Sequence, residues 1–454
     1  MTVGEDRHNQ VVTFGCRLNS YASQALKSAL DESGQSDMAV FNGCAVTSQA
    51  EKQLRQAIRR QKREHPEMKI VVTGCAAQID PEKYAKMAEV DLVLGNEEKS
   101  QAQSYSLDGS VAKKQDRQHF DSHQDKVFYE FRNRLSSDLE DKDQQKIKVN
   151  DIMAVKEGAA HMVSYFDDQT RSFLEIQNGC NHRCSFCIIP FGRGNSRSVM
   201  FKDIVEQTRK MVAAGHKEVV LTGVDISDYG KDLELSMTLS QMIKRLLKLV
   251  PELPRLRLSS IDVAEIDDGF WDLIADEERF MPYFHLSVQS GDDMILKRMK
   301  RRHNRSQVIE FCQKARSLRP DIAFGSDIIA GFPTESDEMF ENSVKLIEEA
   351  DLIFNHIFPY SVREGTVAAN MPQLDGNIIK ERARILREKS EQQLRKYLQN
   401  QDGKEFKVIV EKDERGKTEN FLDIDLSNLR GQNLKVGEIL AVTTKFKDNK
   451  LIAV

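Results

Sequence analysis

The chain has 454 residues, with 66 Lys and Arg against 71 Asp and Glu and a formal net charge of −5. This length excludes a small disulfide-stabilised scaffold and predicts two to four domains. No apolar run approaches the roughly 20 residues that cross a bilayer, and the first ten residues do not resemble a secretory signal. We therefore expect a cytoplasmic protein with no membrane partner.

Three apolar segments near the N-terminus each end in Gly-Cys. VVTFGC ends at Cys16, MAVFNGC at Cys44 and KIVVTGC at Cys75, and a helical pattern follows each of them. This order predicts a parallel α/β domain over residues 8–99. Ligands bind at the carboxyl ends of parallel strands, so we expect three thiols at one sheet edge. In a cytosolic chain with seven cysteines, metal ligands, catalytic groups or buried side chains are more common than disulfides.

The remaining chain predicts four segments. Residues 100–165 are polar and predict an interdomain connection, in which VFYEF (127–131) could form a strand. Six strand patterns alternate with helical patterns over 166–374, which predicts a six-unit open (β/α) barrel. A charged linking helix is expected over 375–402. The short strand patterns of 403–454 predict a small closed β-barrel, so the fold class is α/β with a C-terminal β-barrel.

The most specific motif is a C-x3-C-x2-C triplet after the first barrel strand, formed by Cys180, Cys184 and Cys187. Three thiolates can hold an iron–sulfur cube at three corners and leave its fourth iron open. This indicates a reaction centre rather than an electron carrier. A structural zinc site with His182 as the fourth ligand is an alternative. Cys312 lies in a helical pattern beside apolar residues and is expected to be a core thiol.

The triplet on the first strand of a six-unit barrel resembles the radical S-adenosylmethionine (SAM) superfamily. The resemblance implies a [4Fe-4S] cluster whose open iron binds SAM, which is cleaved to a 5'-deoxyadenosyl radical. It also implies that an aromatic in the loop, Phe186, packs near the adenine. Residues at later strand ends would contact SAM, although each could equally be a helix cap or turn residue: Gly223, Ser259, Gln289, Ser290 and Asp327.

Together with the three Gly-Cys strand ends and the C-terminal barrel, the chain is similar to the methylthiotransferases over nearly its whole length. The resemblance implies that Cys16, Cys44 and Cys75 hold a second [4Fe-4S] cluster, which supplies or carries sulfur, although each alone could be a buried apolar side chain. It implies a TRAM-like, RNA-binding C-terminal barrel. Two SAM molecules would be used, one for methyl transfer and one for the radical that takes hydrogen from C2 of an adenine. No catalytic residue beyond the cluster ligands is indicated.

The segments CAVTSQAEKQLRQAIRR, KRMKRRHNR and FPYSVREGT are most similar to the branch that acts on N6-threonylcarbamoyladenosine in tRNA. Isopentenyladenosine tRNA, a ribosomal protein side chain, and a second cluster used only for electron transfer are alternatives. This chain departs from the family pattern at Thr334, where the family often has Gly, and at Val362, where Pro is usual. GKTENFL also lacks a Tyr that the family often carries.

A basic run at the expected barrel mouth suits tRNA phosphates, although a solvated helix face is an alternative. With cations from two neighbouring segments, the predicted RNA contacts are Arg193, Arg197, Lys297, Arg298, Lys300, Arg301, Arg302, Arg305 and Arg363. Further expected partners are a sulfur source and an electron donor such as flavodoxin or ferredoxin.

Overall fold

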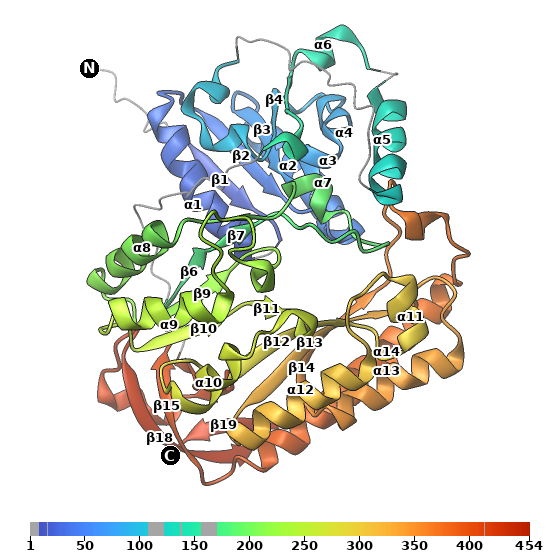
Figure 1. The fold of residues 1–454 in the computed structure, drawn as a ribbon. Helices are drawn as coiled ribbons and strands as arrows, with labels where there is room; N and C mark the ends of the chain where they lie inside the picture. Colours follow the sequence, from blue (N-terminus) through green and yellow to red (C-terminus); the bar gives the residue numbers. More distant parts are fainter. Residues whose placement is uncertain (1–8, 16, 108–121, 137–138, 156–169, 413) are drawn as a thin grey trace, which may run out of the picture. The chain divides into compact units, whose positions relative to one another are not determined.

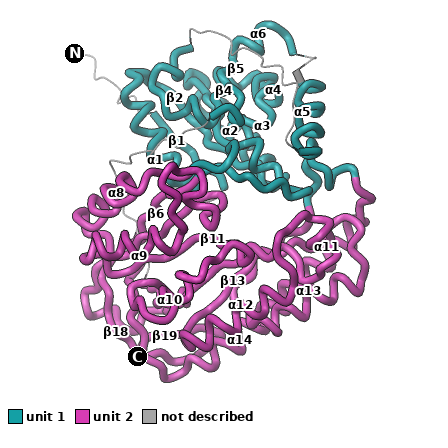
Figure 2. The backbone as a smooth tube through the Cα atoms, viewed as in Figure 1, with its two compact units in different colours: residues 1–165, 178–197, 361–370 teal, residues 166–177, 198–360, 371–454 magenta. Residues whose placement is uncertain are grey.

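The computed structural model describes residues 9–15, 17–107, 122–136, 139–155, 170–412 and 414–454 (Figure 1). The chain forms two compact units, each assembled from three separate stretches (Figure 2). Unit 1 comprises residues 1–165, 178–197 and 361–370. Unit 2 comprises residues 166–177, 198–360 and 371–454. Within the described residues, none of the helices combines the length and apolarity that a bilayer crossing requires.

Unit 1 is built on a parallel five-stranded sheet in the order β1-β2-β3-β4-β5. Its strands are β1 (Gln10–Thr13), β2 (Met38–Gly43), β3 (Lys69–Gly74), β4 (Leu92–Leu94) and β5 (Ile147–Lys148). The first helices are α1 (Arg17–Glu32), α2 (Ser48–Glu64), α3 (Cys75–Ile79) and α4 (Pro81–Ala85). All six residues of β2 are buried, as expected for a central strand of a parallel sheet covered on both faces. The predicted strand-helix order is confirmed.

The polar segment before the triplet contributes to unit 1. It supplies β5, α5 (His123–Ser136) and α6 (Asp141–Gln144). The predicted strand at 127–131 is wrong, because these residues lie inside α5. Phe128 and Phe131 are three residues apart and so share one helical face; Phe131 is buried, and Phe128 stacks on Phe191 with ring centroids 4.0 Å apart. The aromatic run therefore packs with helical periodicity.

Unit 2 contains the predicted open barrel of parallel strands. One sheet has the order β10-β9-β6 and the other β11-β12-β13-β14. Only Ser259 separates β10 from β11, so counting these two as one strand leaves the six that the sequence predicts. The strands are β6 (Arg171–Glu175), β9 (Glu218–Thr222), β10 (Arg255–Leu258), β11 (Ser260–Ile261), β12 (Tyr283–Gln289), β13 (Ala323–Ala330) and β14 (Leu352–Pro359).

Helices alternate with these strands and cover the barrel (Figure 1). They are α8 (Phe201–Ala213), α9 (Leu239–Leu249), α10 (Gly269–Asp276), α11 (Asp293–Arg298), α12 (Arg305–Leu318), α13 (Asp337–Glu349) and α14 (Gly376–Gln399). In the sequence, the segment between β6 and β9 contains α7 (Ile189–Arg193), which belongs to unit 1, and the strands β7 (Gln177–Asn178) and β8 (Arg197–Ser198), which pair in a small two-stranded sheet. Thr334 has a φ of 68°, a left-handed value that β-branched residues rarely adopt. A glycine would occupy this position without strain.

The C-terminal segment forms the predicted closed barrel, in the order β15-β16-β17-β19-β18. Its strands are β15 (Glu405–Val410), β16 (Arg415–Lys417), β17 (Asp423–Asp425), β18 (Ile439–Lys447) and β19 (Lys450–Ala453). Buried Arg257 of β10 donates hydrogen bonds to the carbonyl oxygens of Glu419 and Thr418, at 3.0 and 3.5 Å. Phe421 stacks on Tyr283 with ring centroids 4.7 Å apart. The aromatic of GKTENFL therefore attaches this barrel to the parallel barrel within unit 2.

Candidate cluster sites and their surroundings

Two of the three N-terminal cysteines lie where the Gly-Cys pattern predicts. Cys44 directly follows β2 and Cys75 directly follows β3, and the preceding glycines, Gly43 and Gly74, are paired in register. Both thiols are buried. They therefore stand side by side at the carboxyl edge of the sheet. Cys16 lies outside the described residues.

Each of these two sulfurs accepts a hydrogen bond from nitrogen. The backbone N–H of Val46 donates to Cys44 Sγ at 3.4 Å, and Arg193 Nε donates to Cys75 Sγ at 3.1 Å. A Cβ atom at Gly15 would lie 2.4 Å from the Cβ of Cys44, so this glycine lets the chain pass close to the thiol. Hydrogen-bond donors and a nearby cation stabilise the thiolate, which is the form that ligates iron. The donor set therefore fits an iron–sulfur cluster.

Arg193 was expected to contact RNA, but the structure buries it. Only 3% of the residue is exposed, and its Nη2 group donates to the side-chain oxygen of Asn19. Asn96 donates to the carbonyl oxygen of Gly192 at 2.5 Å and in turn accepts from Lys99 Nζ at 2.7 Å. Charge alone gave no indication of burial at this position. Arg193 thus belongs to the surroundings of Cys75 and not to a phosphate-binding surface.

The radical triplet lies in the same compact unit. Cys180, Cys184 and Cys187 lie in the loop between β7 and α7, within residues 178–197 of unit 1. The backbone N–H of Cys180 donates to the carbonyl oxygen of Gly194, and that of Cys187 to the carbonyl oxygen of Cys184, both at 3.0 Å. Because these bonds fix the turns, the loop presents three thiols from a defined backbone. This arrangement fits a cluster held at three corners.

Arg183, inside the triplet, holds the loop in place, a role that the sequence reasoning did not identify. Its guanidinium donates to the carbonyl oxygen of Cys180 at 2.9 Å, to Asp125 Oδ1 at 2.8 Å and to Asn195 Oδ1 at 2.8 Å. These contacts join the loop to α5 and to the segment after α7. The only available signal was an arginine between two ligands, which is equally typical of an exposed loop.

The predicted SAM contacts have different surroundings. Ser259 Oγ is buried and has no hydrogen-bond partner among the described residues, as a group that awaits a ligand would be. Gln289 has a φ of 71° at the end of β12. Ser290 is fully buried and accepts from the backbone N–H of Asp292, which is a turn contact before α11. A Cβ at Gly223 would lie 2.6 Å from the Gln177 carbonyl oxygen, so the protein itself explains that glycine. Phe186 is half-buried in the triplet loop.

Asp327 joins two histidines that the sequence reasoning did not identify. Its Oδ1 atom accepts from His285 Nε2 at 3.0 Å and from His356 Nδ1 at 3.1 Å. The Tyr283 hydroxyl lies 3.0 Å from His285 Nδ1. Burial alone would raise the pKa of Asp327, but the two histidine hydrogen bonds outweigh it and hold the pKa well below its usual range. The two histidines come near Asp327 through strand pairing: the register of β13 and β14 places His356 opposite Asp327.

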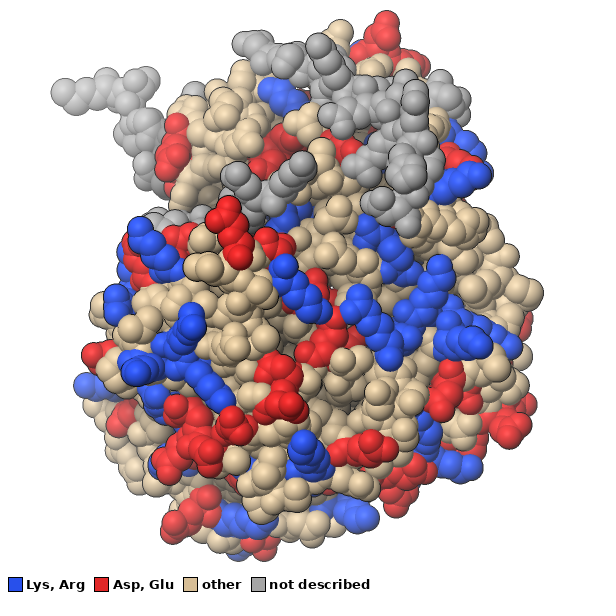
Figure 3. Space-filling view, viewed as in Figure 1, with Lys and Arg blue, Asp and Glu red and all other residues tan. Residues whose placement is uncertain are grey.

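The basic run around α11 gives a group of Lys and Arg side chains on the surface (Figure 3). Most of its arginines bind other parts of unit 2, and its exposed cations are Lys297, Lys300 and Arg302. Arg298 donates to the Thr334 carbonyl oxygen at 3.0 Å, and Arg301 to Asp262 Oδ2 at 2.7 Å. Further contacts are Arg302 with Glu265, and Arg305 with Gly291 and Glu349.

The two remaining predicted RNA contacts are also engaged within the protein. Arg197 is buried. Arg363, which belongs to unit 1, donates from Nη1 to Glu51 Oε1 at 2.6 Å. The predicted cationic surface is therefore much smaller than the sequence suggests, and its exposed members are chiefly lysines.

Comparison with known proteins assigns both cysteine regions to families. Residues 174–347 match the radical SAM superfamily, and residues 8–95 match an uncharacterized protein family, UPF0004. The threonylcarbamoyladenosine tRNA methylthiotransferase MtaB of Rickettsia prowazekii is 52% identical over 95% of this chain and 93% of its own length. The tRNA-2-methylthio-N(6)-dimethylallyladenosine synthase of Bartonella tribocorum is 31% identical over 88% of this chain and 85% of its own.

A solved structure supports the fold. The radical SAM methyltransferase TsrM from Kitasatospora setae, with cobalamin and a [4Fe-4S] cluster bound, has a TM-score of 0.53 and 14% identity, and covers 80% of this chain and 77% of its own. At this identity the likeness concerns the fold alone. The relatives found by sequence identify the family within this superfamily. The chain therefore belongs to the radical SAM methylthiotransferases, in the family that includes MtaB.

Proposed function

We propose that this protein converts N6-threonylcarbamoyladenosine in tRNA to its 2-methylthio derivative, using SAM and two [4Fe-4S] clusters. The observation that carries the substrate is the 52% identity, over 95% of the chain, to an enzyme named for threonylcarbamoyladenosine. Relatives named for dimethylallyladenosine are 31–32% identical to this chain. The two cysteine sets and the hydrogen bonds around them support the binding of two iron–sulfur clusters.

When bound, the clusters and SAM supply the sulfur, the methyl group and the radical that removes hydrogen from C2 of the adenine. Cys180, Cys184 and Cys187 would hold one cluster. Cys16, Cys44 and Cys75 would hold the other. Arg183 fixes the backbone of the triplet loop, and buried Arg193 would orient Cys75 through its hydrogen bond to the ligand sulfur.

Three further groups in unit 2 are proposed to act on SAM or the base. Ser259 and Gln289 would hydrogen-bond SAM. The hydrogen bond between Asp327 Oδ1 and His356 Nδ1 orients the imidazole ring, so that His356 would hydrogen-bond SAM or the base at Nε2.

The domain roles remain proposals. Residues 8–99, together with β5 from the 100–165 segment, would form the auxiliary-cluster domain. Residues 166–374 would form the radical SAM barrel, 375–402 the linking helix and 403–454 an RNA-binding barrel. We also propose that flavodoxin or ferredoxin supplies electrons, that a separate sulfur source serves the enzyme, and that it works in the cytoplasm, where tRNA is modified.

Mass spectrometry of tRNA nucleosides tests the proposed function. In cells that lack the protein, the 2-methylthio derivative of N6-threonylcarbamoyladenosine should be lost, and complementation should restore it. The dimethylallyl counterpart should not change. Loss of the dimethylallyl counterpart instead would overturn the substrate assignment while keeping the reaction type.

A further inference from the structure

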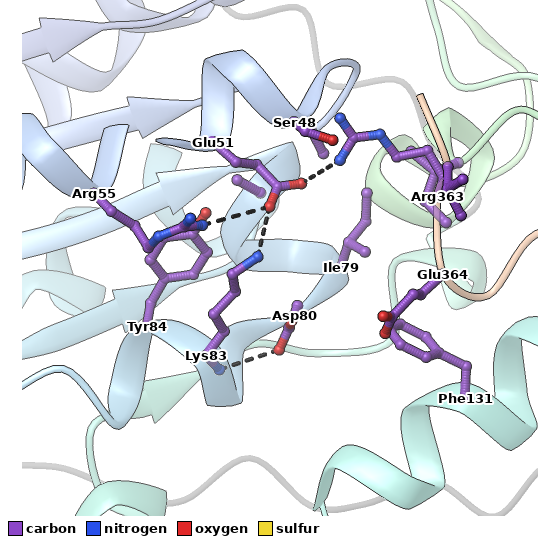
Figure 4. Close-up of a pocket in the computed structure, with 14 residues that line it drawn as sticks. Ser48, Glu51, Arg55, Ile79, Asp80, Lys83, Tyr84, Phe131, Arg363 and Glu364 are labelled. Carbon is purple, nitrogen blue, oxygen red and sulfur yellow. Dashed lines mark hydrogen bonds and ion pairs between the residues drawn. The ribbon is translucent and has the colours of Figure 1, made fainter. Parts of the chain in front are cut away.

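Unit 1 contains a cavity of about 290 Å³ next to the two N-terminal cysteines (Figure 4). Ala45 and Ala76, the residues that follow Cys44 and Cys75, line it. Its polar lining comes from α2, from the α3–α4 region and from the segment after β14: Ser48, Glu51, Arg55, Asp80, Lys83, Tyr84, Arg363 and Glu364. The sequence analysis assigned no role to this set as a group.

One carboxylate at the centre of the cavity contacts three cations. Glu51 Oε2 lies 2.6 Å from Lys83 Nζ and 3.8 Å from Arg55 Nη1. Glu51 Oε1 lies 2.6 Å from Arg363 Nη1. Figure 4 shows Glu51 between the ends of these three side chains. This part of the cavity therefore has more positive than negative charge.

The other two carboxylates of the lining, Asp80 and Glu364, form no ion pair with these three cations within the described residues. Asp80 Oδ1 accepts from the backbone N–H of Lys83 at 3.1 Å and so caps α4. Glu364 is exposed and lies beside Phe131, away from Tyr84 (Figure 4). Asp80 interacts electrostatically with Lys83, so the three cations around Glu51 still exceed the nearby carboxylates, Glu51 and Asp80, by one.

Three donor atoms in the lining, from Tyr84 and Arg363, have no hydrogen-bond acceptor in the part of the chain that the structure describes. Tyr84 is 1% exposed, and its hydroxyl is buried without a hydrogen-bond partner anywhere in the described chain. Its ring extends toward Arg55 and Glu51 (Figure 4). Nε and Nη2 of Arg363 are likewise buried and unpartnered within the described residues. Buried polar groups are rarely left without partners, so these donors point to a ligand that accepts hydrogen bonds.

The arrangement of the donors indicates the chemistry of the ligand. Glu51 occupies only Nη1 of Arg363, which leaves the Nε–Nη2 edge of the guanidinium. That edge offers two parallel N–H donors, the geometry that binds a carboxylate through both oxygens. The 17-residue helix α2 begins at Ser48 in the lining, and its N-terminus adds partial positive charge. The cavity is built for a small anion.

We propose that this cavity binds the carboxylate of the threonyl group on N6 of the adenosine, and thereby selects the threonylcarbamoyl substrate. The proposal rests on the proposed function. A threonylcarbamoyl group ends in a carboxylate and a hydroxyl, whereas a dimethylallyl group is apolar and leaves the donors unpaired. A site built to hydrogen-bond a polar group rejects an analogue that lacks it. The position beside Ala45 and Ala76 would bring the N6 substituent close to the auxiliary cluster.

The test compares two RNA ligands that differ only at the threonyl carboxyl group. The first is an anticodon stem-loop with N6-threonylcarbamoyladenosine, and the second is the same stem-loop with the threonyl carboxylate as its methyl ester. The holoenzyme should bind the acid at least about tenfold more tightly than the ester, because hydrogen bonds to a charged group contribute that much affinity or more. Equal affinities would overturn the proposal.

Two variants locate the effect. Arg363→Lys keeps the charge but removes the two-donor edge, and Tyr84→Phe removes one hydroxyl; each should reduce the preference for the acid several-fold. Tyr84→Phe should not lower thermal stability, because the hydroxyl has no partner to lose, so it remains informative if Arg363→Lys folds poorly. An undiminished preference for the acid in Tyr84→Phe and Arg363→Lys would overturn the site assignment.

Tyr105→Phe is the matched control. Tyr105 is also a fully buried tyrosine of unit 1, but its hydroxyl donates to the Lys99 carbonyl oxygen at 2.6 Å. This change should lower stability and leave the acid-to-ester preference intact. If instead it reduced that preference as much as Tyr84→Phe does, the cavity would not be the source of selectivity.

The proposal and the proposed function fail differently. If cells lacking the protein lose 2-methylthio-N6-threonylcarbamoyladenosine while the purified enzyme binds acid and ester equally, only the cavity assignment is wrong. If the cellular modification is unchanged, the proposed function fails, and a remaining preference for the acid in vitro would then show a carboxylate site that serves another substrate.

Discussion

Arg193 Nε donates a hydrogen bond to Cys75 Sγ at 3.1 Å, although 118 positions separate the two residues in the sequence. Arg193 ends α7, directly after the radical triplet, and Cys75 follows a strand of the N-terminal sheet. Within unit 1, the segment after one set of cysteines therefore controls the electrostatic surroundings of the other set.

Replacing Arg193 should change the auxiliary cluster more than it changes the radical cluster. Arg193→Met removes a cationic donor to a ligand sulfur, which disfavours the reduced cluster. We expect the midpoint potential of the auxiliary cluster to fall by roughly 60–120 mV, the equivalent of one charge-assisted hydrogen bond. Redox titration followed by electron paramagnetic resonance measures it. Arg132→Met is the control and should leave the potential unchanged, since Arg132 binds Glu82 and the Ile79 carbonyl oxygen. An unchanged potential in Arg193→Met would contradict the assignment of Cys75 as a ligand of the auxiliary cluster.

The cysteine triplet should account for half of the bound iron. Anaerobically purified protein is expected to contain about eight irons, and the joint change of Cys180, Cys184 and Cys187 to Ala should leave about four. Iron analysis of the two proteins measures this directly. Full iron in the triple variant would show that these cysteines are not ligands.

Cys312 is the control thiol for that experiment. It is fully buried in α12, and burial raises its pKa to about 12, so it remains a neutral thiol. Cys312→Ala should retain all the iron and lower the free energy of unfolding by roughly 1 kcal/mol through a small cavity. A variant that lost four irons would identify Cys312 as a ligand.

The basic run should separate into residues that bind RNA and residues that hold the fold. Lys297 and Lys300 are exposed, and changing both to Ala should weaken tRNA binding and reduce its salt slope by about one for each phosphate that is no longer neutralised. Binding measured across a salt series gives the slope. An unchanged slope would mean that these lysines face solvent only.

Arg301→Leu should behave differently from the lysine variants. Burial would raise the pKa of Asp262, but hydrogen bonding to His303 and the charge of Arg301 hold it well below its usual range. Asp262 therefore stabilises the fold above about pH 4, and this contribution is lost as the pH falls. The variant should lose roughly 3 kcal/mol at neutral pH in denaturant titrations, with an unchanged salt slope for tRNA. A reduced slope at full stability would return Arg301 to the RNA surface.

The buried pair Arg257 and Glu218 should be essential for the junction inside unit 2. Their two hydrogen bonds measure 2.7 and 3.1 Å, and both side chains are fully buried. Arg257→Met removes both hydrogen bonds of the buried Glu218 carboxylate and leaves it with Arg255 Nη1 at 3.8 Å, which should cost about 3 kcal/mol of unfolding free energy. The double variant with Glu218→Leu should regain much of that loss. Equal stability of the single variant and the unchanged protein would contradict this role.

The sequence predicted the elements whose signal is local. Gly-Cys after an apolar run indicated a strand end, and Cys44 and Cys75 directly follow β2 and β3; their role as iron ligands stays a prediction. Arg193 could not be interpreted in the same way, because an arginine has the same charge when buried as when exposed. The aromatic run at 127–131 has high β propensity, but packing on a helical face decided its structure. His285 and His356 became significant only through the strand register that places them around Asp327.

The discontinuity of unit 1 constrains how the protein folds during synthesis. Its last stretch, residues 361–370, is made only after most of unit 2. Glu51 and Arg363 are separated by 312 positions, which a ribosome takes about 15 to 60 seconds to translate. During that interval the nascent N-terminal sheet has no Arg363 beside Glu51, so the cavity next to Cys44 and Cys75 is incomplete. The order of translation thus makes this cavity one of the last parts of the enzyme to be assembled.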